Sequence, residues 1–356
     1  MRTQKAASRK NILRAFATVP LALILAALIP SAILAQSGGA PGPAASEAPP
    51  ASVSVYTATG ATTAALPLLV ALRDGWPGVK ADVTEWKNLD DLRALLLAGK
   101  GDVWVGHLDA FARAAYRGAP VRLVSVTAWK KFWFVSAPLP LDEGKDPRPP
   151  ADIAELAGYL SKNDLTLTTS PQGGPGPDLL AAIAASGGPA FKASTFPGQQ
   201  AALELSTGRA VAALLPEPLV SMALLKNPKL VVVGSLEEEF AEAMGGLPRL
   251  PQAGVGVNSA FAKAHPKLSQ GLQGALTAAG DKIKDLPAYE LVGLLPKSTR
   301  DALGDKALEL SFGRDPIIVQ NAKDVAPEIE RFLCWTAGDL CGSGRLDANF
   351  PPDFLF

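Results

Sequence analysis

The sequence predicts an α/β protein of two lobes, each built on a mixed, mostly parallel sheet flanked by helices, with a cleft between the lobes. Beyond residue 50, short apolar runs rich in β-branched residues alternate with amphipathic stretches, an order typical of crossover units. A proline-rich polar stretch, 137–150, interrupts this series and marks a boundary. The residues beyond the atypical first 50 of the 356 suffice for two lobes of roughly 100–200 residues each.

The alternation gives each lobe its own series of elements. In the first lobe we expect strands at 52–57, 79–85, 102–105 and 121–127, and helices at 63–73, 89–97 and 108–116. In the second we expect strands at 165–169, 191–195, 210–214 and 230–233, and helices at 151–160, 178–186 and 199–207. A further strand, 253–258, and helices 267–284 and 326–335 form a tail that returns to the first lobe.

Two extended segments, near 132–136 and 250–257, are expected to join the lobes. The first lobe is therefore expected to comprise 51–136 and 250–356, and the second 137–249. The ligand site would lie in the cleft between them, where strand ends and helix starts converge.

The amino terminus is typical of a secretory signal peptide, 1–35. Five basic residues up to Arg14 precede an apolar core at 21–29, and a small-residue site ends at Ala35. Retention as an uncleaved anchor is the alternative. Cleavage would place the protein in the periplasm, with 36–50 as a flexible linker, and the lack of a cysteine near Ala35 excludes a lipid anchor there.

Charge argues against a nucleic-acid partner. The chain has 34 basic and 34 acidic residues, so losing the five amino-terminal basic residues leaves 29 against 34, a net charge of −5. The body has no block of Lys or Arg that could form a basic stripe. Past residue 35 no apolar run approaches the ~20 residues of a membrane span.

Cys334 and Cys341 are the only cysteines, with six residues between them. An oxidising compartment favours a disulfide, and two buried free thiols are the alternative. These thiols and the histidines His107 and His265 are too few and too scattered for a zinc site. We expect neither metal nor cofactor.

Four stretches carry a resemblance to a known family: 96–125, 206–218, 254–268 and the terminal LDANFPPDFLF. In their order and spacing they resemble the substrate-binding proteins of bacterial ABC importers, of the nitrate/sulfonate/taurine and thiamine-precursor type. The resemblance implies the type II periplasmic binding protein fold, a small polar or anionic ligand, and a membrane permease as partner of a monomeric protein. The turn SPQGGPGPD at 170–178 is longer than in relatives, which puts the ligand contacts there in doubt.

Candidate ligand-binding residues follow the predicted strands. In the first lobe Thr57, Thr59, Gly60 and Thr62 surround a helix start, where hydroxyl and backbone N–H groups suit an anion or polar head group; helix capping alone is the alternative.

Gly106 and His107 follow the next strand. His107 could donate to a ligand and titrates near physiological pH, or it could bond only to its own backbone. Asp109 is expected to be a solvated or capping acid.

In the second lobe Ser170, Gln172 and Gly173 repeat the arrangement, although a simple turn is favoured there. Glu217, between two prolines, is a ligand acceptor or a latch between lobes, and a surface turn is the alternative. If Glu217 faces the ligand, a cationic or amide-bearing ligand is favoured. Trp129 is the aromatic residue most expected to line the cleft.

Catalysis is not expected. The motifs G-x-S-x-G, H-E-x-x-H and G-x-x-x-x-G-K-[ST] do not occur in the chain. The alternatives to uptake are a ligand-binding sensor without a transporter and an enzyme of the same fold, such as a pyrimidine-precursor synthase. Adjacent permease and ATPase genes would favour uptake over sensing.

Overall fold

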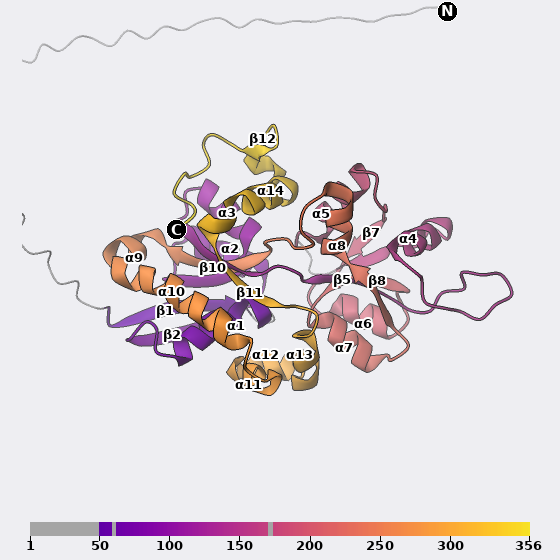
Figure 1. Cartoon of the computed structure of the whole chain (residues 1–356), viewed down its shortest axis with the longest axis horizontal. Coiled ribbons are helices and arrows are strands. Elements are labelled where there is room, and N and C mark those ends of the chain that lie inside the picture. Colours follow the sequence, from indigo (N-terminus) through magenta and orange to yellow (C-terminus); the bar gives the residue numbers. More distant parts are fainter. Residues whose placement is uncertain (1–49, 59–61, 170–173) are drawn as a thin grey trace, which may run out of the picture. The chain divides into compact units, whose positions relative to one another are not determined.

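A computed structural model describes residues 50–58, 62–169 and 174–356, all of which belong to one compact unit. Two sheets organise these residues (Figure 1). The first has the order β11-β4-β10-β3-β1-β2, with β1 Ser52–Ala58, β2 Lys80–Trp86, β3 Val103–His107, β4 Val121–Ala128, β10 Ala253–Asn258 and β11 Ile317–Asn321. The second has the order β7-β6-β8-β5-β9, with β5 Phe132–Ser136, β6 Leu167–Thr169, β7 Ala193–Thr195, β8 Ala212–Pro216 and β9 Val231–Ser235.

Both sheets are mixed. In the first, β1 pairs in parallel with β2 and β3, whereas β10 lies antiparallel to β3 and β4, and β11 antiparallel to β4. In the second, β6 pairs in parallel with β7 and β8, and β5 runs antiparallel between β8 and β9. Most strands of each sheet thus run in one direction, and the strand that enters from the other sheet, β10 or β5, runs in the opposite direction. In the first sheet β11 also runs in that opposite direction.

Helices flank both sheets. Those of the first half are α1 Thr62–Arg73, α2 Leu89–Leu97, α3 Leu108–Tyr116, α4 Ile153–Lys162, α5 Gly176–Ala185, α6 Gln200–Ser206, α7 Leu219–Lys226 and α8 Leu236–Met244. The tail adds α9 Ser259–Ala264, α10 Pro266–Ile283, α11 Ala288–Leu294, α12 Lys297–Leu303, α13 Asp305–Ser311 and α14 Ala326–Thr336, and the short 3-10 helices η1 Ala322–Val325 and η2 Gly338–Leu340. None of the helices in this part of the chain is long and apolar enough to cross a bilayer.

Local sequence explains the elements that frame the site. The side chain of Asn88 accepts hydrogen bonds from the N–H groups of Asp90 and Asp91, which caps α2. Gly106 has no room for a side chain, because a Cβ there would come within 2.7 Å of Leu92. A glycine at the end of β3 therefore lets α2 pack closely against the first sheet.

The prediction that 132–136 is a connector between the lobes is wrong. These residues form β5 inside the second sheet, so the chain passes from the first sheet to the second at 129–131 and returns at 245–252. The strand was missed because only three residues separate it from β4, without the intervening helix that marks a crossover. The short helices α11–α13 and strand β11 were also not predicted.

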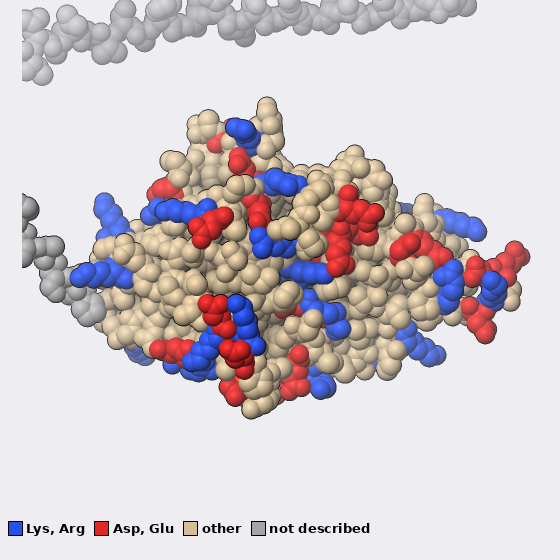
Figure 2. Space-filling view, in the orientation of Figure 1, with Lys and Arg blue, Asp and Glu red and all other residues tan. Residues whose placement is uncertain are grey.

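The cysteines form the expected disulfide between Cys334 in α14 and Cys341 in the two-residue strand β12, Cys341–Gly342. That strand pairs with β13, Arg345–Leu346. The bridge thus ties the end of α14 to the hairpin that follows it. On the face shown in Figure 2, basic and acidic side chains are interspersed and form no continuous basic stripe.

Candidate functional site

The carboxyl ends of β1 and β3 lie side by side, because the two strands are parallel neighbours. Thr57 lies near the end of β1 and Thr62 begins α1; both are 1% exposed. His107 ends β3, and Asp109 lies in the first turn of α3, which follows directly. The first-lobe candidates within the described residues are therefore gathered at one edge of the first sheet.

Four buried polar atoms at this edge have no hydrogen-bond partner in the described part of the chain: Thr57 Oγ1, Thr62 Oγ1, His107 Nδ1 and Asp109 Oδ1. We call these four residues the strand-end cluster. Since neither threonine hydroxyl is bonded, helix capping alone does not explain them. His107 likewise provides no side-chain cap for α3. Buried polar groups in proteins are normally hydrogen-bonded, so four such atoms together mark a place where a partner is missing.

The burial of Asp109 differs most from what the sequence predicted. This residue was expected to be solvated or to cap a helix; instead it is only 6% exposed, and no hydrogen bond or ion pair reaches its carboxylate from the described residues. Its position in the first turn of α3 gains about 0.3–1 kcal/mol from the helix dipole. The helix dipole compensates the charge only in part, because a buried carboxylate also requires hydrogen-bond donors.

His107 is neutral at physiological pH. Burial lowers the pKa of its imidazole, Asp109 opposes this shift, and the positive charges of Lys131 and Arg93 add to it. We expected His107 to titrate near physiological pH, but burial lowers its pKa below the usual value of 6.5.

A second group of buried polar residues joins the two sheets, and here the charged groups are paired. Lys131, on the first passage between the sheets, donates from Nζ to Asp315 Oδ2 at 2.9 Å and to the Glu217 carbonyl at 3.1 Å. The hydroxyl of Thr63 donates to the same Asp315 oxygen at 2.5 Å. These contacts connect α1, the passage, β8 and the segment before β11.

Glu217 belongs to this junction. Its carboxylate, buried at the turn after β8, accepts from Arg314 Nε at 2.5 Å and from the N–H and hydroxyl of Ser221 at 3.1 Å each. The surface-turn alternative is therefore wrong, and the contact with Arg314 is the one a latch between the lobes requires. Replacing Glu217 would remove a buried structural pair, so such a variant would not test ligand binding alone.

Glu237, at the start of α8, ties together both passages of the chain. Its Oε1 accepts from the N–H groups of Lys131 and Phe132, at 2.8 and 3.2 Å, and from the side chain of Gln252. Burial outweighs these bonds and raises the pKa of Glu237 to about 7. We call Lys131, Asp315, Glu217, Arg314 and Glu237 the junction cluster.

Trp129 does not have the role expected of it. Its ring is fully buried, its Nε1 donates to the Ile318 carbonyl of β11 at 3.0 Å, and the guanidinium of Arg249 lies 4.5 Å from the ring centre. These contacts make it a core residue beside the first passage. The remaining candidates, Thr59, Gly60, Ser170, Gln172 and Gly173, lie outside the described residues, as does the amino-terminal segment 1–49.

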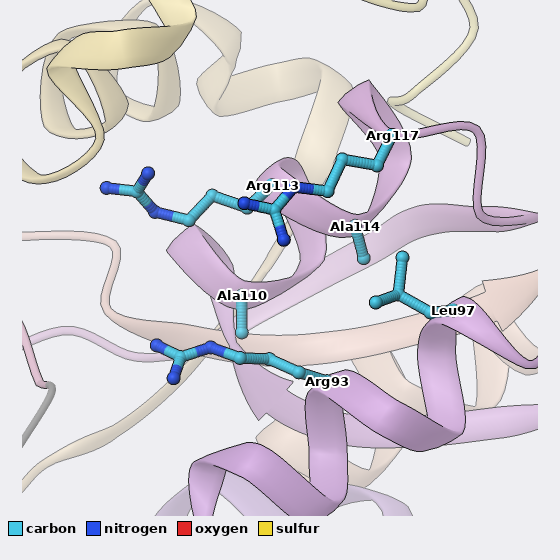
Figure 3. A pocket seen from close by; sticks show the side chains of 6 residues that line it. All are labelled: Arg93, Leu97, Ala110, Arg113, Ala114 and Arg117. Atoms are coloured by element: carbon cyan, nitrogen blue, oxygen red, sulfur yellow. The ribbon is translucent and has the colours of Figure 1, made fainter.

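A cavity of about 290 Å³ lies between α2 and α3, and no residue of the strand-end cluster lines it (Figure 3). Arg93 enters it from α2, and Arg113 and Arg117 from α3, over an apolar lining of Leu97, Ala110 and Ala114. The positive charge of Arg93 reaches His107 and contributes to its lowered pKa. No group of histidine, cysteine and acidic side chains suited to a metal ion occurs among the described residues.

Sequence reasoning missed most of the junction. Lys131 and Asp315 are 184 residues apart in the chain, and Glu237 stands in a run of three glutamates that reads as a solvated helix start. The only sequence feature that could have indicated a role for Lys131 was its position next to a predicted connection between the lobes.

Solved structures share this architecture, although the sequence matches no family model and no curated protein. An ABC transporter structure from Parabacteroides distasonis is 19% identical, with a TM-score of 0.57, covering 85% of this chain and 99% of that one. The periplasmic aliphatic sulphonate binding protein SsuA from Escherichia coli is 17% identical, with a TM-score of 0.56 and coverage of 79% and 85%. The periplasmic nitrate-binding protein NrtA from Synechocystis is 14% identical, with a TM-score of 0.55 and coverage of 72% and 68%. The chain has the periplasmic binding protein fold. The fold class predicted from the sequence is thereby confirmed.

Proposed function

We propose that this protein is an extracytoplasmic solute-binding protein that delivers a small polar ligand to an ABC importer in the membrane. The observation that carries the proposal is the strand-end cluster: four buried polar atoms, gathered at adjacent strand ends, that have no hydrogen-bond partner among the described residues. In α/β sheets ligands bind at the carboxyl ends of strands. SsuA and NrtA, which share the fold, bind a sulphonate and nitrate according to their names.

In this proposal two lobes close on the ligand. The first lobe comprises 51–136 and 250–356, and the second comprises 137–249, except that β5 belongs to the sheet of the second lobe. The ligand shifts the equilibrium toward the closed conformation because it binds that conformation more tightly than the open one. The latch between Glu217 and Arg314 and the links of Glu237 to both passages would hold the lobes in register during closure. Neither lobe would contribute a catalytic group.

The proposal is tested by native mass spectrometry of protein purified gently from the periplasm, because binding proteins keep tightly bound ligand. We expect a bound small molecule. Adding that molecule to ligand-free protein at a hundred times its dissociation constant should raise the free energy of unfolding by about 2.7 kcal/mol. Small-angle scattering should show a smaller radius of gyration in the bound form. A protein that carries no ligand and is stabilised by none would contradict the proposal.

Localisation has its own test. We expect exported protein to begin near Gln36 and to be released with the periplasmic fraction as a monomer. Amino-terminal sequencing that finds Met1 on membrane-bound protein would contradict cleavage and favour the uncleaved anchor.

A further inference from the structure

The carboxylate of Asp109 is the feature of the strand-end cluster that most restricts the ligand. The other deeply buried acids of the two clusters, Asp315, Glu217 and Glu237, each accept hydrogen bonds from the protein. Asp109 is 6% exposed and receives none from the described residues. A carboxylate accepts hydrogen bonds and has no proton to donate when it is ionised. The partner it lacks is therefore a donor.

The cations around Asp109 are engaged elsewhere. Arg113, one helical turn later, has the spacing of an ion-pair partner, but its guanidinium bonds to Asp339 and to the Thr336 carbonyl. Arg93 bonds to Asp90 at 2.9 Å, and Lys131 to Asp315. Arg117 is eight residues further along α3, roughly 12 Å along the helix axis. Arg93, Arg113 and Arg117 line the cavity of Figure 3, whose lining does not include Asp109.

A second carboxylate, that of Asp178, lies close enough to Asp109 for the two charges to interact. Asp178 lies in the first turn of α5. Partial burial raises its pKa, the positive charge of Arg113 opposes this shift, and the negative charge of Asp109 adds a smaller contribution that raises it. Helix α14 packs against both α3 and α5 and holds the two helices near each other. The negative charges of Asp109 and Asp178 both disfavour a further anion near Asp109, and Arg113 offsets this effect at Asp178.

We propose that the ligand carries a protonated nitrogen or another N–H donor that binds the Asp109 carboxylate, while its polar remainder bonds to Thr57, Thr62 and His107. The inference rests on the proposed solute-binding function and narrows its ligand class. The neutral imidazole and the two hydroxyls can accept or donate hydrogen bonds, so they suit an uncharged polar group or the anionic end of a zwitterionic ligand. Nitrate and simple sulfonates have no N–H group and would bring a negative charge to Asp109. The inferred ligand class therefore differs from a bare inorganic or sulfonate anion.

The experiment combines ligand identification with a matched pair of probes. Native mass spectrometry of the mature protein gives the composition of the retained molecule, which we expect to contain an N–H group. Calorimetry then compares taurine with isethionate, which has a hydroxyl in place of the ammonium, and with nitrate. Wild-type protein should bind taurine about 100-fold more tightly than isethionate. Asp109→Asn should abolish this preference, and for the retained ligand it should weaken binding about 100-fold.

Asp164→Asn is the matched control. It makes the same chemical change at an exposed acid, paired with Lys192, at the end of α4 in the second lobe, and should bind like wild type. A retained molecule without an N–H group, isethionate or nitrate binding as tightly as taurine, or unchanged affinity for the retained ligand in Asp109→Asn would each overturn the inference. If the protein retains nothing and binds no probe, the solute-binding function itself fails and the inference falls with it.

Discussion

The junction cluster and the strand-end cluster both hold buried polar side chains, but they differ in pairing. At the junction each charged side chain has a partner on another element, as Lys131 has in Asp315 and Glu217 has in Arg314. Of these side chains, only Asp315 also has a buried oxygen, Oδ1, without a partner in the described residues. At the strand ends Thr57, His107 and Asp109 have buried polar atoms without any partner in the described residues. Burial alone therefore does not distinguish structural polar residues from binding residues. The difference in pairing predicts that changes at the junction reduce stability and changes at the strand ends reduce binding.

The largest effect is expected from Lys131→Met. The substitution leaves the Asp315 carboxylate, which is fully buried, without its ammonium partner, and breaking a buried pair in this way costs about 3–5 kcal/mol. Urea unfolding measures the loss. Lys130→Met is the control, because Lys130 pairs with the half-exposed Glu238 and such pairs contribute about 0–1 kcal/mol. Equal losses in the two variants would mean that the junction pairing is not what stabilises this region.

Glu237 gives the junction a dependence on pH. Its folded pKa of about 7 lies above the ordinary value of 4.5, so its contribution to stability is fully present below pH 4.5 and is lost as pH rises through about 7. Over that window wild type should lose about 3 kcal/mol relative to Glu237→Gln, which keeps an oxygen for the N–H groups of Lys131 and Phe132. Unfolding free energies measured between pH 4.5 and 8 test this. Parallel curves for the two proteins would contradict it.

The disulfide lies outside both clusters, so we expect its removal to reduce stability without affecting ligand binding. Replacing Cys334 and Cys341 together by serine should lower the free energy of unfolding by roughly 2–3 kcal/mol, because the unfolded chain regains the freedom of a short loop. Ligand binding should remain as in wild type. Free thiols in denatured, unreduced wild-type protein, or binding lost in a variant that is still folded, would contradict this account.

The sequence predicted the fold better than the site, for physical reasons. Alternating apolar runs are a local signal, and the strand at 253–258 and the helices at 89–97 and 108–116 have the predicted bounds. The pairing of Lys131 with Asp315 depends on the tertiary fold and leaves no local pattern. For Asp109 the usual rule, that an acid at a helix start is solvated or caps the helix, gave the wrong prediction. The absence of a partner becomes visible only when all neighbours are placed in space.

The free energy of unfolding of ligand-free Asp109→Asn tests the contrast between the clusters most directly, because it requires no knowledge of the ligand. If Asp109 has no partner in the protein, neutralising it removes a buried charge and breaks no bond. We expect stability equal to wild type or up to about 1 kcal/mol higher, in the same urea experiment in which Lys131→Met loses about 3–5 kcal/mol. A loss of about 2 kcal/mol or more in Asp109→Asn would show that the carboxylate is bonded within the protein, and would contradict the assignment of the strand-end cluster as a binding site.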